Sequence, residues 1–392
     1  MILQRDEPGN SSGVVQPRQL RNAHYPVSMI FGRLDGKQTL FRERRHQVHV
    51  WQKGEAGMAD WRSALRGDPT DWLLQEDDPS VRYLTLVDIM DRPAGAAEVE
   101  QARAEIMRTG VVPAILSKQA DGGYWERSDR SYDAKYRGTV WQLIILAELC
   151  ADGDDERVRK GCEFVLDDLQ DIESHGFSVH HGVKTGGGRH SEVIPCLTGN
   201  LAWSLLRLGY GGDARLERAV DWIVRYQRFD DGVVDPPVGW PYDKYEMCWG
   251  RHTCHMGGAK ALKALSEIPR ANRSADVRRT IDQGVEYVLA HHVHKRSHDL
   301  TQVSKPGWLR FGFPLMYQTD ALEMLGILTR LGCRDERMRE AVELVVSKQD
   351  AAGRWKLVNT FNGRFQVDVE EKGRPSKWVT LNALRVLKAW AA

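Results

Sequence analysis

Apolar residues gather in a series of segments that would be apolar almost all the way round a helix. The segments are 138–149, 196–208, 254–265, 317–328 and 376–387, and residues 80–90 would form one more, a period earlier. Their starts lie roughly 60 residues apart. A repeat of this length that carries one buried helix predicts stacked helical hairpins.

Between these segments lie stretches in which apolar residues recur at i, i+3, i+4 and i+7, with charged residues in the remaining positions. They are 155–166, 213–227, 274–290 and 335–349. Such a pattern is typical of helices that pack on one side and face water on the other. We therefore expect an all-α fold, an (α/α)6 toroid with inner and outer helices, formed by residues 58–392 as a single domain.

A short phrase follows most of the amphipathic stretches, at residues 118–125, 226–232 and 348–355, and combines Gln, Gly and an aromatic residue. Glycine can end a helix in the left-handed conformation. The phrase resembles the QW motif of squalene–hopene and oxidosqualene cyclases. The helical period is similar to that of protein prenyltransferase β subunits and lanthionine cyclases. The resemblance covers residues from about 60 to 392 and implies the terpenoid cyclase and prenyltransferase toroid, a fold that hosts several chemistries.

The amino-acid composition limits the kinds of partner and the cellular location that we expect. The 392 residues carry 55 basic and 54 acidic side chains, so charge favours neither nucleic acid nor an anionic membrane as a partner. The sequence shows neither a membrane span nor a signal peptide, and six cysteines in so long a chain predict a reducing, cytoplasmic location. We expect a mobile or poorly structured extension over residues 1–57, and a monomer or homodimer.

If all inner helices begin at one mouth of the ring, the residues at their starts converge. These residues are Arg137, Cys196, Cys254, His255, Tyr317, Asp320 and Lys377. Two of the starts share a form, Cys196-Leu-Thr-Gly and Cys254-His-Met-Gly. A helix N-terminus lowers the pKa of a thiol, and two thiolates with an imidazole are a normal catalytic zinc set.

The resemblance to lanthionine cyclases, and to the zinc rim of protein prenyltransferases, implies Cys196, Cys254 and His255 as Zn²⁺ ligands. The first motif departs from the usual Trp-Cys-Tyr-Gly, because Pro195 and Leu197 flank Cys196 here. Cys248 is an alternative ligand. Buried cysteines also often only pack, so a core role for these residues stays open.

Other side chains could serve the same mouth. His190 and His252 precede the two cysteine segments and suit general acid–base roles near neutral pH. Asp320 could act on zinc-bound water, or pair with Arg137 or Lys377, and Tyr317 lies beside it at the same start. The expected cavity-lining aromatic residues are Trp141, Trp203 and Trp378.

Three functions remain open. The first is a zinc-dependent enzyme that activates a thiol or water at the mouth of an apolar cavity, for a small-molecule or peptide substrate with an apolar part. The second is a metal-free terpenoid cyclase-like enzyme with Asp320 or the turn 368–371 as its acid. That turn, Asp-Val-Glu-Glu, departs from the cyclase motif Asp-x-Asp-Asp at its last two positions. The third is a non-catalytic, ligand-binding toroid.

Overall fold

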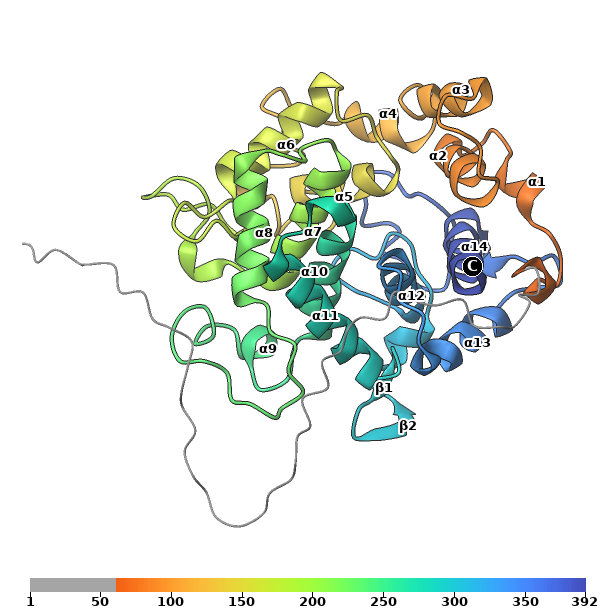
Figure 1. Ribbon diagram of the computed structural model, residues 1–392. Helices are drawn as coiled ribbons and strands as arrows, with labels where there is room; N and C mark the ends of the chain where they lie inside the picture. The colour runs from red at the N-terminus through yellow and green to blue at the C-terminus, as the bar shows by residue number, and fades with distance from the viewer. Residues whose placement is uncertain (1–60) are drawn as a thin grey trace, which may run out of the picture. The chain divides into compact units, whose positions relative to one another are not determined.

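A computed structural model describes residues 61–392 of the chain, and nearly all regular structure in this part is helical (Figure 1). The predicted extension 1–57 lies outside the described residues. Along the chain, the first helices are α1 (Thr70–Leu73), α2 (Pro79–Leu84), α3 (Ala97–Ile106), α4 (Val111–Leu116), α5 (Thr139–Glu148), α6 (Glu156–Asp168) and α7 (Pro195–Arg207). They are followed by α8 (Ala214–Tyr226), α9 (Glu246–Trp249), α10 (His255–Glu267), α11 (Ala275–Ala290), α12 (Ala321–Arg330), α13 (Arg339–Ser347) and α14 (Lys377–Ala391).

Two small antiparallel sheets complete the described part. Strands β1 (Lys295–Arg296) and β2 (Asp299–Val303) form a hairpin after α11, and β3 (Trp355–Lys356) pairs with β4 (Pro375–Ser376) before α14. Short 3₁₀ turns lie at 61–64, 128–130, 190–192, 270–272, 306–309 and 336–338. None of the helices in residues 61–392 combines the length and the apolar character that a membrane-spanning helix needs.

The predicted inner helices pack side by side into a ring. Helix α7 contacts α5 and α10, α10 contacts α12, α12 contacts α14, and α14 contacts α2. The ring closes where the Ser80 hydroxyl of α2 donates to the Leu149 carbonyl at the end of α5, over 2.7 Å. Helices α3, α6, α8, α11 and α13 lie outside this ring, each against an inner helix (Figure 1). The all-α, toroid-like fold that the hydrophobic pattern predicts is the observed fold.

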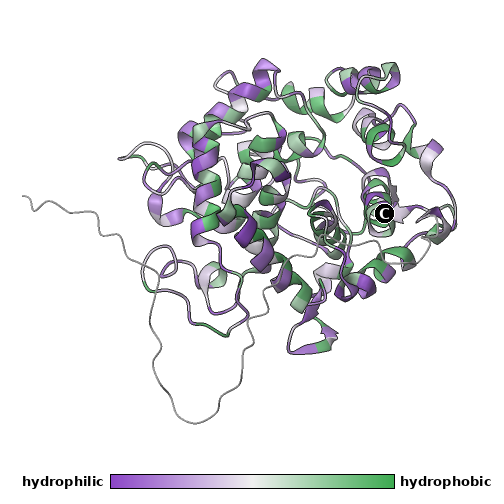
Figure 2. Ribbon diagram, in the orientation of Figure 1, coloured by the Kyte–Doolittle hydropathy of each residue, from purple (hydrophilic) through white to green (hydrophobic). Residues whose placement is uncertain are grey.

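Burial separates the two layers as the sequence pattern predicts. In α5, nine of ten residues are buried, and in α7 eleven of thirteen, whereas α6 and α8 each bury five of thirteen. Figure 2 shows the same contrast, with hydrophilic residues along the outer faces of the outer helices. Inner helices can approach closely because Gly199 of α7 lies against the backbone of Lys260 in α10, where a Cβ atom would come within 2.5 Å of its carbonyl carbon.

Two of the Gln–Gly–aromatic motifs make equivalent hydrogen bonds at the connections between outer and inner helices. The indole Nε1 of Trp125 donates to the Ile115 carbonyl at 2.9 Å, and that of Trp355 donates to the Val345 carbonyl at 2.7 Å. The amide of Gln119 reaches the Arg157 carbonyl at the start of the next outer helix, at 2.8 Å. Much of the tryptophan content is therefore structural.

Helix boundaries agree with the predicted ranges to within a few residues, except at one outer and two inner helices. The outer helix predicted over 335–349 starts as a 3₁₀ turn over 336–338 and becomes α13 at Arg339. The helix predicted over 317–328 begins only at 321, because Asp320 has extended backbone angles and caps α12 from outside. The helix predicted over 80–90 is α-helical only to residue 84 and continues as a wider, π-helical turn over 85–89.

Candidate active site

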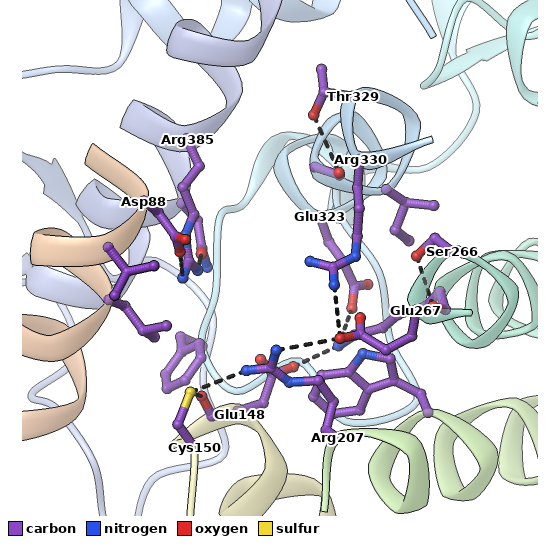
Figure 3. Close-up of a pocket in the computed structure, with 18 of the residues that line it drawn as sticks. Asp88, Glu148, Cys150, Arg207, Ser266, Glu267, Glu323, Thr329, Arg330 and Arg385 are labelled. Atoms are coloured by element: carbon purple, nitrogen blue, oxygen red, sulfur yellow. Dashed lines mark hydrogen bonds and ion pairs between the residues drawn. The ribbon is translucent and has the colours of Figure 1, made fainter. Parts of the chain in front are cut away.

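A cavity of about 1070 Å³ lies inside the ring, at the ends where the inner helices finish (Figure 3). Its rim is formed by the last residues of the inner helices and by the short connections that follow them, among them 150–154 and 207–209. Deeper, the lining includes the segment 312–315 and Asp320, which precede α12. The inner helices thus do run in one direction, but the cavity opens at their C-terminal mouth and not at the predicted N-terminal one.

The length of the connections explains this difference. From α6 to α7 the chain uses 26 residues, whereas from α7 to α8 it uses six. Likewise, 28 residues join α8 to α10, and only seven join α10 to α11. Long connections fold over the N-terminal mouth, and short ones leave the C-terminal mouth open.

Asp320 is the acidic residue at the floor of the cavity. Its side chain caps α12: one oxygen accepts from the Glu323 backbone N–H at 2.9 Å, and the other from the Gly312 N–H at 2.9 Å. The residue is 1% exposed. Burial, assisted by the nearby Glu323 carboxylate, raises the pKa of Asp320 to about 7 although the two N–H donors act in the opposite direction. It pairs with neither Arg137 nor Lys377.

Beside Asp320, four charged side chains from three inner helices form a buried ionic network. Lys260 Nζ is 2.8 Å from both carboxylate oxygens of Glu323, and Lys263 Nζ is 3.0 Å from Glu323 and 2.5 Å from Glu148. The network is neutral overall. Burial alone would raise the pKa of Glu323, but Lys260 and Lys263 outweigh it and lower that pKa to about 2.

Aromatic contact with the cavity comes mainly from two side chains. Trp203 lines the wall and holds the Lys263 ammonium 3.8 Å from its ring centroid. Phe313 lines the floor and stacks on Trp378, with centroids 4.3 Å apart. Trp378 therefore lies behind Phe313, outside the cavity lining, and Trp141 is also outside it.

At the rim, charged residues meet across the helix ends (Figure 3). The Glu267 carboxylate at the end of α10 contacts the guanidinium groups of Arg207 and Arg330, at 3.3 and 2.8 Å. Arg207 also lies 3.1 Å from the Cys150 sulfur, and Arg385 donates from Nε to Asp88 at 2.8 Å.

The proposed zinc ligands lie at the other mouth and do not form a metal site. Within residues 61–392, no group of three or more His, Cys, Asp or Glu side chains is placed to hold a metal ion. Cys196 is buried, and burial, together with the neighbouring Cys248 and Cys254 thiols, raises the pKa of its thiol to about 12. His255 instead faces the outer layer, near Tyr287, His291 and Trp308, and burial lowers its pKa to about 4.

The two histidines predicted as acid–base groups lie in the long connections. His190 Nδ1 is 2.7 Å from the Asp171 carboxylate, and its ring stacks on Trp240 at 4.1 Å. His252 has a side chain that is 70% exposed and lies 3.4 Å from Asp231. Neither histidine lines the central cavity. Their partners, which sequence could not show, hold them as parts of folded connections.

Tyr317 and Trp141 belong to an aromatic cluster at the N-terminal mouth. The Tyr317 hydroxyl is 3.3 Å from that of Tyr136, and the Tyr317 and Trp141 rings are 6.2 Å apart. Arg137 pairs with Glu126 at 2.7 Å, and Lys377 pairs with Asp77. Of the residues predicted to converge, only Asp320 reaches the cavity.

The turn 368–371 contributes a second buried acid, at an unexpected position. Asp368 accepts from the Gly363 N–H at 2.9 Å, whereas Glu370 accepts from the Lys377 N–H at the start of α14, at 2.6 Å. Burial raises the pKa of Glu370 to about 7. Glu370 does not line the cavity, so it acts as a helix cap.

Sequence reasoning identified Asp320 and Trp203 in the cavity lining but missed the charged network beside them. Glu148, Lys260, Lys263 and Glu323 lie within segments that were interpreted as apolar throughout. A charged residue inside an otherwise buried helix needs a partner of opposite charge. The presence of four such residues in the inner-helix segments was the sequence signal that could have predicted the network.

Comparison with known proteins adds little. The sequence matches no protein-family model and no curated protein. Among solved structures, the chain is similar to the type II terpene cyclase MstE from Scytonema in its apo form, with 13% identity, a TM-score of 0.38, and 79% of this chain and 87% of that chain covered. A variant of that cyclase in complex with geranylgeranyl dihydroxybenzoate gives 14% identity and a TM-score of 0.36, over 80% and 87% of the two chains. Likeness at this level supports no argument about function.

Proposed function

We propose that this chain is a metal-free, acid-initiated cyclase or isomerase that acts on an alkene or epoxide in the central cavity, with Asp320 as the proton donor. The observation that carries the proposal is the state of Asp320. It faces the cavity, is excluded from bulk water, and has a pKa raised to about 7. A carboxylic acid that keeps its proton near neutral pH is the group that such chemistry needs.

The proposed reaction begins when the Asp320 carboxyl gives its proton to an alkene carbon or an epoxide oxygen. The cation that forms is attacked by a second double bond of the same molecule. A neighbouring carbon then loses a proton to water at the open mouth, and Asp320 regains a proton from solvent. The product is therefore an isomer of the substrate. The backbone N–H groups of Gly312 and Glu323 already point at the Asp320 oxygens and would stabilise the carboxylate left behind.

The cavity walls support a transient cation. Trp203 and Phe313 present aromatic rings, which attract positive charge through their π faces. The contact between Lys263 and Trp203 shows that one of these rings already accommodates a cation. Because the residues of the proposed zinc set do not fit a metal, no step of this reaction is routed through one.

The test compares the wild type with Asp320→Asn. Asparagine also caps helices well, so the variant should keep its fold while losing the acidic proton. Squalene, its terminal epoxide and geranylgeraniol serve as probes in the presence of a chelator, with gas chromatography–mass spectrometry to detect same-mass cyclic products. We expect at least about a hundredfold loss of rate in Asp320→Asn. Glu105→Gln, on the exposed face of α3, is the matched control and should be unaffected.

The rate of the wild type should fall as pH rises through about 7, because the donor must be protonated. Equal rates in the wild type and Asp320→Asn, or a rate that rises over the same pH range, would contradict the proposal.

A second candidate, a ligand-binding toroid without turnover, is favoured by one observation. Charged side chains in the wall are already paired with each other, as in the network of Lys260, Lys263, Glu148 and Glu323. Such a wall suits recognition of a polar ligand. Tight binding of a probe by both the wild type and Asp320→Asn, with no same-mass product in either, would favour this candidate.

A further inference from the structure

The cavity rim contains a pair of arginines that share a single carboxylate. Arg207 comes from the end of α7 and Arg330 from the end of α12, and both contact the same Glu267 oxygen, Oε1, at 3.3 and 2.8 Å (Figure 3). The Glu267 side chain is 11% exposed, so little water screens these contacts. Two guanidinium charges against one carboxylate leave one positive charge without compensation.

Two further carboxylates line the cavity near this pair, but neither forms an ion pair with it. Glu148 acts on Arg207 while its carboxylate is already 2.5 Å from the Lys263 ammonium, and Asp152, in the connection after α5, is exposed. The Cys150 sulfur lies 3.1 Å from Arg207 Nη2, but burial raises the pKa of this thiol and keeps it neutral. Arg334, one turn beyond Arg330, donates to the Ala389 carbonyl at 2.8 Å, and no carboxylate of residues 61–392 forms an ion pair with it. This side of the rim is therefore cationic.

The opposite side of the rim is balanced. Arg385 pairs with Asp88, and Lys388 pairs with Asp91 at 2.6 Å. Below the rim, the wall contains Trp203, Phe313, Leu322 and Ile327 beside the neutral network of lysines and glutamates. The cavity thus has a cationic patch at its entrance and an interior with no net charge, a distribution that matches an amphiphile with an acidic head.

We propose that the substrate of this cavity carries a carboxylate head group, which Arg207 and Arg330 bind at the rim while its apolar body extends toward Asp320. This inference rests on the proposed function for the role of Asp320, and on the rim geometry for the head group. Arginine binds carboxylates through its planar fork of N–H donors, and Glu267 already shows that a carboxylate fits between these two guanidinium groups.

The charges around the cavity favour a head with a single negative charge. Eight carboxyl groups and seven basic side chains line the cavity, so the wall as a whole does not attract a strongly charged anion. A carboxylate head matches the single positive charge left over at Arg207 and Arg330. A diphosphate would bring further negative charge to a cavity whose lining also contains Asp152, which forms no ion pair within residues 61–392.

The test measures binding with a ligand that cannot react. Dodecanoate has no double bond to protonate, so its affinity reports the head-group site without the chemistry at Asp320. Isothermal titration calorimetry on the full chain compares dodecanoate, dodecanol and acetate. We expect dodecanoate to bind at least about tenfold more tightly than either of the others, the size expected for a charge-assisted contact.

Substitutions of the rim arginines test where the carboxylate head group binds. Arg330→Gln should weaken dodecanoate about tenfold and leave dodecanol unchanged, and Arg330→Lys should fall between Arg330→Gln and the wild type. Arg108→Gln, an exposed arginine paired only with Glu105 at 3.4 Å, is the matched control and should bind like the wild type. Because Arg207 is less exposed, Arg207→Gln is interpreted only with an unchanged melting temperature.

Dodecanol binding as tightly as dodecanoate, acetate binding as tightly as dodecanoate, or Arg330→Gln behaving like Arg108→Gln would each overturn the inference.

These outcomes are independent of the proposed reaction. Asp320→Asn should still bind dodecanoate with wild-type affinity. If dodecanoate binds as expected while Asp320→Asn has no effect on cyclisation, the proposed function fails and the head-group site stands. If neutral polyprenes are cyclised and Arg330→Gln does not change dodecanoate binding, the head-group site fails and the proposed function stands.

Discussion

The two mouths of the ring are built from the two ends of the same inner helices, yet they differ in almost every physical respect. The C-terminal mouth is open, and charged side chains from the helix ends line it. The N-terminal mouth is covered by aromatic rings from the long connections. There Tyr136 stacks on Phe361 at 4.0 Å, and Tyr132 lies 5.0 Å from Trp141. Connection length, more than helix sequence, decides which end of the toroid holds a cavity.

The aromatic mouth also holds a cation of its own. The Lys135 ammonium lies 4.5 Å from the Tyr132 ring centroid and 5.2 Å from that of Tyr317. One mouth thus places its positive charges against carboxylates around an open space, and the other places one against π faces in a packed cluster. We expect mutations at the first mouth to change ligand binding and buried electrostatics, and mutations at the second to change packing alone.

The largest effect is expected from Glu323→Gln, below the open mouth. This change leaves Lys260 and Lys263 with only Glu148 as a carboxylate partner, and breaking a buried pair in this way costs about 3 to 5 kcal/mol of unfolding free energy. Urea unfolding at pH 7 measures it. The exposed-pair variant Glu105→Gln should lose less than about 0.5 kcal/mol, and a similar small loss in Glu323→Gln would show that the network is not stabilising.

The stability that Glu323 contributes should also depend on pH. The pKa of Glu323 is lowered to about 2 in the folded chain, from an ordinary value of 4.5. Its contribution to stability is therefore present above pH 4.5 and is lost as pH falls toward 2. The wild type should lose more stability than Glu323→Gln over this interval, and parallel curves would show that Glu323 is not held by its lysines.

A smaller loss is expected from Phe361→Ala at the closed mouth. The ring is half-buried against Tyr136 and Phe365, so removing it should cost about 2 kcal/mol, below the range for a fully buried phenylalanine. Dodecanoate binding should stay unchanged because Phe361 does not line the cavity. A loss of affinity beyond threefold would show that the two mouths are coupled.

The smallest effect is expected from Lys135→Met, which keeps the apolar stem and removes the ammonium from its aromatic neighbours. A cation–π contact at a partly exposed site contributes about 1 kcal/mol, equivalent to a melting temperature lower by about 1 to 2 °C in a domain of this size. Lys160→Met, on the exposed face of α6, is the control. Equal melting temperatures in the two variants would mean that the aromatic cluster does not hold Lys135.

Much of the fold could be predicted because burial and periodicity are local properties of the sequence. The nearly all-apolar stretch 138–149 could only be an inner helix, and the charged face of 213–227 could only be an outer one. One further Gln–Gly–aromatic motif was missed. Gln170 donates to the Arg215 carbonyl at 2.8 Å, as Gln119 does to the Arg157 carbonyl. It was missed because Gly176 and Phe177 follow Gln170 at a different spacing.

The site was harder to predict because it depends on directions that sequence does not contain. Cys254 and His255 are adjacent in sequence, but Cys254 is the N-cap of α10 with an extended backbone and His255 is its first helical residue. The His255 ring lies against Tyr287 and His291, at the α11 side. Asp320 was identified as a charge in an apolar setting, but its raised pKa follows from burial beside Glu323, which requires the ring to be closed.

The way the ring closes also sets an order for folding. Gln349 donates to the Ala64 carbonyl, Arg385 pairs with Asp88 and Lys388 with Asp91, across sequence separations of 285 to 297 residues. On the ribosome, the hairpins can stack in turn, but residues 61–91 cannot make their contacts with residues 349–388 until α14 has emerged. Contacts so distant in sequence form late and slowly. The seam between α2 and α14 is therefore where we expect the nascent ring to be most exposed to chaperones and proteases.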